Sequence, residues 1–351
     1  MKITLVSDAW FPQVNGVVRT LSTVVDIATA RGHRVQTITP DRFFSVPMPS
    51  YPEIRLALTT RRRVAATIAG FDPDAVHIAT EGPLGWLARN WCMRHNVPFT
   101  TSFHTRFPDY VAARTGLSPR PFWRVLERFH RPASHVLVAT PRLAAELADH
   151  GIDRTLPWTR GVDLALFSPN RDPHPAFAGL PRPIALHVGR VAVEKNIEAY
   201  LAADWHGSKV VVGDGPALDD LMARFPAVHF LGSLHGEALA STYAGADIMV
   251  FPSRTDTFGL VIIEALASGT PVAGYPVPGP LDILGETGCG LPSGRRIGGV
   301  DADLSAAMLA ALTADRADAA AYGAQFSWER SCDQFLAALA EVDVPLLGLA
   351  A

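Results

Sequence analysis

The feature that most constrains the fold is an alternation of short strands and helices that runs through the sequence twice. In the first half we predict strands at Lys2–Ser7, Arg34–Thr39, Ala75–Ala79, Pro98–Phe103 and His135–Ala139. In the second half we predict strands at Pro183–Val188, Lys209–Val212, Val228–Leu231, Ile248–Phe251 and Pro271–Ala273. Stretches of helical periodicity separate most of them. Repeated strand–helix units form parallel sheets with helices on both faces, so we expect an α/β protein.

A proline-rich segment separates the two halves. Residues 168–183 have no hydrophobic period, which is typical of a linker. We therefore expect two doubly wound domains, residues 1–167 and 184–326. A helical pattern at about 327–345 predicts a last helix that packs back on the first domain. Two such domains bind ligands in the cleft between the carboxyl ends of their strands.

Composition limits the class of protein. The chain has 351 residues, enough for two cores, and its 48% apolar content excludes a disordered chain. It contains no apolar run of membrane-spanning length, and its first residues enter a strand without a signal-peptide pattern. The three cysteines, Cys92, Cys289 and Cys332, lie far apart and are interpreted as reduced thiols. We expect a cytoplasmic protein.

Charge is divided unevenly along the chain. The first 165 residues hold 20 Lys and Arg against 13 Asp and Glu, and the remainder holds 11 against 21. A basic half suggests contact with an anionic surface, which can be a membrane, a nucleic acid or a charged substrate.

A stretch with two acidic residues carries the strongest functional signal. Asp256 follows a predicted strand in a loop, and Glu264 lies eight residues later on a predicted helix. Both carboxylates then face one side, next to the free N–H groups of a helix start near Phe258 and Gly259. Such a site suits a ligand rich in hydroxyl groups. The alternative is a helix cap and a solvated acid, but the helix is apolar nearly all round, and a buried carboxylate needs a partner or ligand.

Basic residues follow the first strand of the second half. Gly189, Arg190 and Lys195 lie where that strand ends, and Lys195 is one of only three lysines in the chain. An arginine and a lysine together can neutralise a diphosphate. The alternative is a solvated pair in a loop.

The first half offers weaker signals at its own strand ends. Gly16 opens a helix and permits close approach of a phosphate, although a plain turn explains it equally well. His104 follows a predicted strand, with Arg106 and Asp109 just beyond it. Glu81 follows another strand and either contacts an acceptor or caps the next helix.

A basic, aromatic helix is the candidate membrane surface. Arg120, Arg124 and Arg128 recur at helical spacing around Trp123. This pattern is typical of a helix held at an anionic bilayer. The alternative is a helix with its aromatic rings on the sheet and its arginines in solvent. The two Asp-x-Asp patterns, at 72–74 and 301–303, are interpreted as a turn and a helix cap, so we assign no metal.

Several motifs in order resemble a known family. They are the Asn15-Gly16-Val17 opening, F-H-T, R-G-V-D, G-R-V-A-V-E-K-N, V-V-G-D-G-P and the paired-acid stretch. Together they make the chain resemble the retaining glycosyltransferases of family four, in the bacterial branch of mannosyltransferases and glycolipid-forming enzymes. The resemblance implies the GT-B fold, two Rossmann-like domains facing a central cleft, and covers almost the whole chain.

The resemblance also implies roles for the candidate residues. Arg190 and Lys195 would bind the diphosphate of a GDP- or UDP-sugar, which Gly16 would approach. Glu264 would bind the ribose, and Asp256, with the backbone at Phe258 and Gly259, the transferred sugar. His104 would lie beside the anomeric carbon. Asp256 stands where the motif more commonly has Glu. This departure leaves the identity of the transferred sugar undetermined.

We therefore expect a retaining, metal-independent transferase of mannose, glucose or glucuronate. The basic first half suggests a lipid acceptor at the inner face of the membrane. With the transferase resemblance, we expect no nucleic-acid partner. A soluble or polysaccharide acceptor, a sugar-nucleotide epimerase and a non-catalytic nucleotide-binding module are the alternatives.

Overall fold

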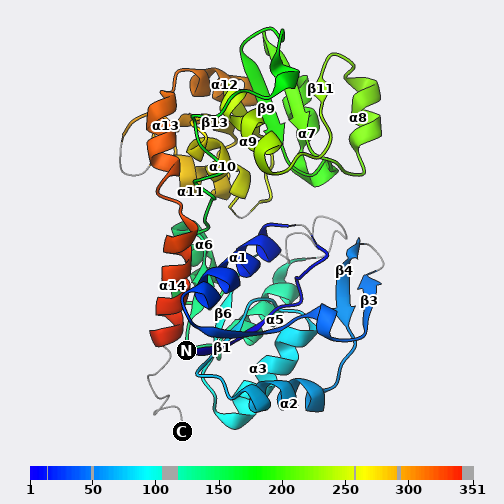
Figure 1. Ribbon diagram of the computed structural model, residues 1–351, viewed down its shortest axis with the longest axis vertical. Coiled ribbons are helices and arrows are strands. Elements are labelled where there is room, and N and C mark those ends of the chain that lie inside the picture. Colours follow the sequence, from blue (N-terminus) through cyan, green and yellow to red (C-terminus); the bar gives the residue numbers. More distant parts are fainter. Residues whose placement is uncertain (14, 49–50, 105–117, 257, 291–293, 342–351) are drawn as a thin grey trace. The chain divides into compact units, whose positions relative to one another are not determined.

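The computed structural model describes residues 1–13, 15–48, 51–104, 118–256, 258–290 and 294–341 (Figure 1). The described chain divides into two units. The first comprises residues 1–160 together with helix α14 (Trp328–Ala340), and the second comprises Gly161–Ser327. None of the helices in this described part is long and apolar enough to cross a bilayer.

The first unit is built on a sheet of six parallel strands in the order β2-β1-β5-β6-β7-β8. The strands are β1 (Lys2–Val6), β2 (Arg34–Ile38), β5 (Ala75–Ile78), β6 (Thr100–Ser102), β7 (Val136–Val138) and β8 (Thr155–Pro157). The helices are α1 (Gly16–Ala30), α2 (Arg61–Phe71), α3 (Pro83–His95), α5 (Arg120–His130) and α6 (Pro141–Asp149). A hairpin of β3 (Ser45–Met48) and β4 (Tyr51–Ala57) stands beside the sheet.

Helix α14 closes one face of this sheet. Figure 1 shows it beside α1, and its Cys332, Phe335 and Leu339 pack in one apolar cluster with Leu21 and Val24 of α1. The apolar spacing of its sequence explains this packing, because the three residues share one helical face.

The second unit repeats the architecture with a parallel sheet in the order β11-β10-β9-β12-β13-β14. The strands are β9 (Ile184–Val188), β10 (Ser208–Val212), β11 (His229–Phe230), β12 (Ile248–Phe251), β13 (Val272–Gly274) and β14 (Gly298–Val300). The helices are α7 (Ile197–Ala202), α8 (Leu218–Arg224), α9 (Gly236–Gly245), α10 (Leu260–Ala267), α11 (Pro278–Leu284), α12 (Leu304–Leu312) and α13 (Arg316–Gly323). Short 3-10 turns are η2 (Pro175–Phe177) and η3 (Val193–Lys195) in this unit and η1 (Pro40–Arg42) in the first unit.

Strand order places a switch point in each sheet. In the second sheet the chain runs outward from β9 through β10 to β11 and then returns to β12 on the other side of β9. The loops that follow β9 and β12 therefore leave adjacent carboxyl ends in opposite directions, and ligands of doubly wound sheets bind at such a point. The first sheet has the equivalent point between β1 and β5.

The proline-rich segment predicted as a linker at 168–183 packs within the second unit. His174 donates its backbone N–H to Ser241 of α9, and the buried ring of Phe177 lies 3.0 Å from where a Cβ on Gly245 would stand. The absence of a hydrophobic period in this segment therefore indicated irregular structure, and the segment packs against helix α9.

Candidate active site

Two predicted ligand-binding residues bind each other at the switch point of the second sheet. Lys195 ends the turn after β9, and Asp256 lies in the loop after β12. The Lys195 Nζ is 2.6 Å from Asp256 Oδ1 and 2.9 Å from Oδ2. Both side chains are partly exposed, 26% and 19%. Asn196, in the left-handed conformation, donates to the Pro252 carbonyl at 3.1 Å and ties the two loops together.

The loop that carries Arg190 packs against the glycine motif after β10. A Cβ on Gly213 would lie 1.9 Å from the Gly189 carbonyl oxygen, so only glycine fits. Gly189 has a positive φ of 155° and is half-buried, whereas Arg190 is exposed. This close contact holds Arg190 on the edge of the sheet from which Lys195 also projects.

Helix α10 begins as the sequence predicted, at the backbone of Phe258 and Gly259. Gly259 caps it with φ +88°, and a Cβ there would lie 2.9 Å from the Phe251 ring. Phe258 is buried and packs edge-on against Phe326. The start of the helix is thus fixed by two aromatic contacts and a conformation that favours glycine.

Glu264 is 3% exposed, which agrees with the prediction of a buried carboxylate that needs a partner. Its Oε2 accepts a hydrogen bond of 3.0 Å from the phenol of Tyr243, a fully buried residue of α9. The pair joins helix α10 to its neighbour α9. Tyr243 is therefore one of the groups that orient this carboxylate oxygen.

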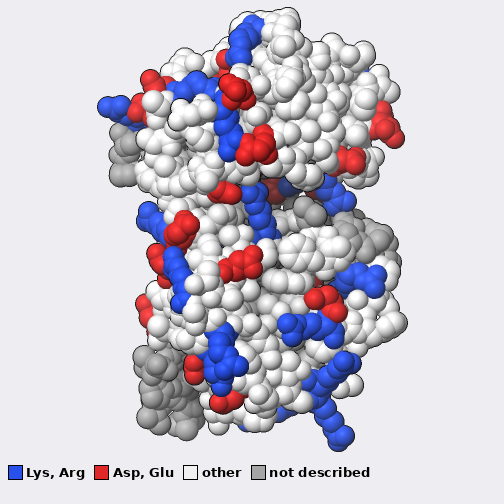
Figure 2. Space-filling model, viewed as in Figure 1, with Lys and Arg blue, Asp and Glu red and all other residues white. Residues whose placement is uncertain are grey.

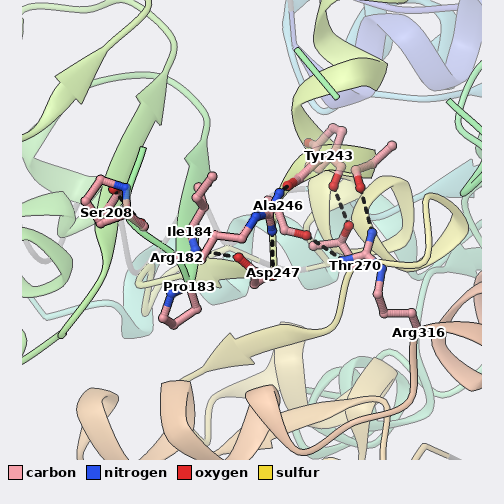
Figure 3. Close-up of polar contacts among 12 residues, drawn as sticks. Arg182, Pro183, Ile184, Ser208, Tyr243, Ala246, Asp247, Thr270 and Arg316 are labelled. Atoms are coloured by element: carbon pink, nitrogen blue, oxygen red, sulfur yellow. Dashed lines mark hydrogen bonds and ion pairs between the residues drawn. The ribbon is translucent and has the colours of Figure 1, made fainter. Parts of the chain in front are cut away.

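Figure 3 shows how the end of α9, which carries Tyr243, is held. Arg316 donates to the carbonyl groups of Ala244 and Ala246, and Thr270 donates to the carbonyl of Tyr243. Arg182 bonds the Gly245 carbonyl at 3.0 Å and Asp247 at 2.7 Å. Cations at a helix C-terminus satisfy its last carbonyl groups and its dipole.

A buried histidine lies beneath the same loops. His187 of β9 donates from Nδ1 to the Val250 carbonyl at 3.1 Å, and its Nε2 has no hydrogen-bond partner within the described residues. Burial lowers the pKa of His187 to about 4, so the ring is neutral at neutral pH.

The switch point of the first sheet holds a buried carboxylate that the sequence analysis did not single out. Asp8 follows β1 and accepts from the backbone N–H groups of Leu84 and Gly85 at 2.9 and 3.2 Å, and from the Thr80 hydroxyl. It therefore caps helix α3 from another part of the chain. Burial raises the pKa of Asp8 to about 6, against the lowering effect of these hydrogen bonds.

His104 lies in a network of buried polar groups at the end of β6. Arg160 donates to its Nδ1 at 2.9 Å, and its Nε2 is 2.8 Å from the Ser102 hydroxyl. Because a guanidinium can only donate, Nδ1 is an acceptor and a neutral His104 carries its proton on Nε2. Burial, followed by the charge of Arg160, holds the pKa of His104 well below its usual range.

The remaining predicted residues of the first unit have varied surroundings. Glu81 bonds His130 Nε2 at 3.1 Å, while Gly82 occupies the cap position of α3. Gly16 starts α1, where Asn15 Oδ1 accepts from the backbone N–H groups of Val17 and Val18. Arg106 and Asp109 lie outside the described residues.

Helix α5 divides its predicted membrane residues between two faces. Trp123 is 6% exposed, stacks on His150 and lies against Phe103, so this ring packs inside the unit and presents no face to a bilayer. Arg120, Arg124 and Arg128 are exposed. The helix is strongly amphipathic because a sheet-facing helix must bury its aromatic side.

Comparisons with known proteins agree with this geometry. Residues 14–166 match the model "Glycosyltransferase Family 4", and residues 182–313 match "Glycosyl transferases group 1". A GDP-mannose-dependent alpha-mannosyltransferase of Mycolicibacterium smegmatis is 34% identical over 83% of this chain and 84% of its own length. The chain belongs to glycosyltransferase family 4. It is a glycosyltransferase with the GT-B fold.

Two further proteins place this glycosyltransferase among its relatives. The alpha-monoglucosyldiacylglycerol synthase of Streptococcus pneumoniae is 27% identical over 79% of this chain and 72% of its own length. The HepE protein of Anabaena, solved in complex with UDP, has a TM-score of 0.70 and 18% identity, with 97% of this chain and all of that chain covered.

Sequence reasoning identified the strand-end residues of this glycosyltransferase but missed their supports. Asp8 could have been found, because it directly follows a predicted strand. Tyr243 gave no signal, because only the packing of α9 on α10 brings it to Glu264. Within the described chain, no three His, Cys, Asp or Glu side chains group as metal ligands, and metal independence stays a prediction.

Proposed function

We propose that this glycosyltransferase moves a hexosyl group, mannose first among the candidates, from a GDP-sugar to a membrane lipid with retention of configuration. The pairing of Lys195 with Asp256 at the switch point carries the proposal. It combines a cation for the diphosphate with a carboxylate for sugar hydroxyls at one position. The similarity to a GDP-mannose-dependent mannosyltransferase supports the donor, and the similarity to a monoglucosyldiacylglycerol synthase supports the lipid acceptor. The UDP complex of HepE makes a UDP-sugar the second donor to test.

In this proposal Lys195 and Arg190 bind the donor diphosphate. An ammonium group has three N–H donors, and two of them reach the Asp256 oxygens. The third can bind a phosphate oxygen without breaking the ion pair. Arg190, on the same loop, adds a planar fork of donors that matches phosphate geometry. Together they stabilise the negative charge that develops as the diphosphate leaves.

The acidic residues hold the neutral parts of the donor. Asp256, with the backbone at Phe258 and Gly259, accepts from hydroxyls of the transferred sugar. Glu264 accepts from the ribose hydroxyls, with one oxygen oriented by Tyr243. These are hydrogen bonds from neutral donors to ionised acceptors, which are stronger than those between neutral groups.

The chemical step is a front-face substitution. The bond between the anomeric carbon and the diphosphate oxygen breaks, and the acceptor hydroxyl attacks from the same face. The acceptor proton passes to the departing phosphate oxygen, so no side chain needs to act as a nucleophile. His104 acts as a neutral imidazole beside the anomeric carbon, because Arg160 occupies its Nδ1. The two cations supply the positive charge that the leaving group needs, so we propose that the reaction requires no metal.

Thermal-shift measurements with GDP, GDP-mannose, UDP-glucose and UDP-glucuronate test the donor. We expect the largest stabilisation with GDP-mannose. The purified enzyme with GDP-mannose and extracted membrane lipids should then yield a lipid heavier by one hexose, also in the presence of EDTA. NMR of the product should show the α configuration of the donor at the anomeric carbon, as expected for a retaining transferase.

Other outcomes would replace parts of the proposal. Transfer to a soluble glycan but to no lipid would make the acceptor soluble. Conversion of the nucleotide sugar without any acceptor would make the protein an epimerase. Activity that EDTA abolishes and a divalent cation restores would overturn metal independence. A lipid product would also support the proposal that the enzyme acts at the inner face of the membrane. Fractionation of cells can then test whether the enzyme is associated with the membrane.

A further inference from the structure

A basic cavity of about 810 Å³ lies in the first unit, and two of the predicted membrane residues, Arg124 and Arg128, are among its lining residues. Its walls include Pro98 and Phe99, which precede β6, and Arg154, which precedes β8. These are amino ends of strands in a parallel sheet. Asp8 and His104 follow the carboxyl ends of β1 and β6. Because the two ends of parallel strands lie at opposite edges, the cavity is separate from these residues.

The charge of this cavity is strongly positive. Five arginines line it, against the single carboxylate of Glu127; they are Arg89, Arg124, Arg128, Arg131 and Arg154. All except Arg89 are exposed, and within the described chain the side chains of those four make no hydrogen bond or ion pair. Like charges gathered around one cavity repel each other, and a bound anion relieves this repulsion.

Arg89 forms a fixed wall between α3 and α5. It is 8% exposed and donates to the carbonyl groups of Arg128 and Phe129 at 2.6 and 2.9 Å. Burial and the nearby charge of Arg128 lower the pKa of Arg89. The C-terminal end of α5 is therefore anchored, and the Arg128 and Arg131 side chains project from a rigid element. Figure 2 shows Lys and Arg side chains gathered on the lower right of this unit, where Figure 1 labels α2 and α3.

Most of the rest of the lining is apolar, and Asn96 is its one neutral amide. The apolar part includes Met93, Val97, Pro98, Phe99 and Pro132, and Met93 is 47% exposed. Phe99 is 2% exposed, so no aromatic face is offered to a stacked base. Single-stranded nucleic acids need such a face beside the positive charge. A pocket lined by both arginines and apolar side chains instead matches a ligand that has an anionic group and an apolar group. A phospholipid has both.

We propose that this pocket binds an anionic phospholipid, with its phosphate among Arg128, Arg131 and Arg154 and its apolar part against Met93 and Pro98. A lipid held at the amino edge of the sheet is an anchor and does not receive the sugar. The proposal rests on the proposed function only in assuming that the enzyme works at a membrane. Binding of the phospholipid to this pocket can be measured without any glycosyl transfer.

Vesicle binding of the full chain tests the pocket. The vesicles contain phosphatidylcholine with or without phosphatidylglycerol. The pocket variant is Arg131→Gln with Arg154→Gln, and the matched control is Arg61→Gln with Arg62→Gln, two exposed arginines of α2 outside the cavity. We expect binding only with phosphatidylglycerol, weakened about tenfold or more by the pocket changes and less than about threefold by the control.

A soluble ligand separates a lipid site from a simple anion site. Dihexanoyl phosphatidylglycerol should shift the emission of a fluorophore on Met93→Cys and compete with vesicles, and glycerophosphate should do so far more weakly. Equal competition by glycerophosphate, equal loss in both arginine pairs or no binding by the unchanged protein would each overturn the proposal.

Measuring donor binding in the pocket variant distinguishes a failure of the lipid pocket from a failure of the proposed function. The pocket variant should keep the thermal shift with GDP-mannose of the unchanged protein. A protein that binds phosphatidylglycerol through the pocket but transfers no sugar to lipid would support the pocket and refute the lipid acceptor.

Discussion

The Lys195 ammonium group lies within 3 Å of both carboxylate oxygens of Asp256, so each of these residues compensates the charge of the other before any donor binds. This arrangement has a measurable consequence, since the two residues are proposed to hold different parts of one donor. Removing either one should affect nucleotide binding and turnover differently.

We expect Lys195→Ala to weaken GDP binding by about tenfold or more, because it removes a charge-assisted hydrogen bond to the diphosphate. Asp256→Ala should bind GDP at least as well as the unchanged protein, because Lys195 loses its competing partner, yet should lose turnover. Calorimetry with GDP and kinetics with GDP-mannose measure the two effects.

Lys2→Ala is the matched control, since it removes an exposed Lys–Asp pair of 3.1 Å in the first unit. GDP binding should not change in this control. Equal GDP affinity in Lys195→Ala and the unchanged protein would refute the diphosphate role of Lys195.

The Tyr243 phenol should determine donor affinity through Glu264. Tyr243→Phe keeps the ring and removes the phenol–carboxylate bond, leaving Glu264 Oε2 without that donor. We expect a loss of about 1 to 3 kcal/mol in the free energy of unfolding and a several-fold higher KM for the donor, with kcat less affected. Denaturant unfolding and kinetics measure both.

Tyr200→Phe provides the comparison. Tyr200 is also fully buried in the second unit, but its phenol bonds the backbone of Ala185 and Val210. This variant should lose stability without a change in donor KM. A KM increase in both variants would mean that Tyr243 acts only through stability.

The sequence was sufficient to predict the architecture because strand–helix alternation follows directly from local periodicity. It missed the β3–β4 hairpin beside the first sheet. It also missed β8 and β14, since Thr155–Pro157 and Gly298–Val300 contain proline or glycine in place of a β-branched run. These two edge strands are defined by their pairing with β7 and β13, which local patterns do not contain.

The candidate site was predictable to the extent that it depends on strand ends. Lys195 and Asp256 follow strands that proved adjacent, and the apolar sequence of α10 predicted the burial of Glu264. The orientation of Trp123 was left open by the sequence, because an aromatic residue on an amphipathic helix can face either a sheet or a lipid. The tertiary fold decides this, and here the ring faces the unit's own core.

Asp8 should make stability depend on pH in an unusual direction. Its folded pKa of about 6 lies above the ordinary value of 3.8, so the folded protein keeps this proton more tightly than the unfolded chain does. The resulting stabilisation is fully present below the unfolded pKa and is lost as pH rises through about 6, by about 3 kcal/mol in all.

Asp8→Asn should abolish that part of the slope. Unfolding in denaturant from pH 4 to 7 should show a difference in unfolding free energy between the two proteins that changes by most of this amount, whatever the constant cost of the substitution. Asp41→Asn, at an exposed position, is the matched control for the loss of one carboxylate. Parallel stability curves for Asp8→Asn and the unchanged protein would contradict the raised pKa.

Arg160 should keep His104 neutral. In Arg160→Gln the positive charge near His104 Nδ1 is lost, while the burial that contributes most to the lowered pKa remains. The pKa of His104 should therefore rise but stay below 6.5, its ordinary value. NMR titration of the imidazole signals measures this directly, with buried His187 of the second unit, which bonds the Val250 carbonyl, as the internal reference. If activity requires neutral His104, the acid limb of the pH–rate profile should move to higher pH by the same amount. A shifted pKa with an unmoved acid limb would show that protonation of His104 does not limit catalysis.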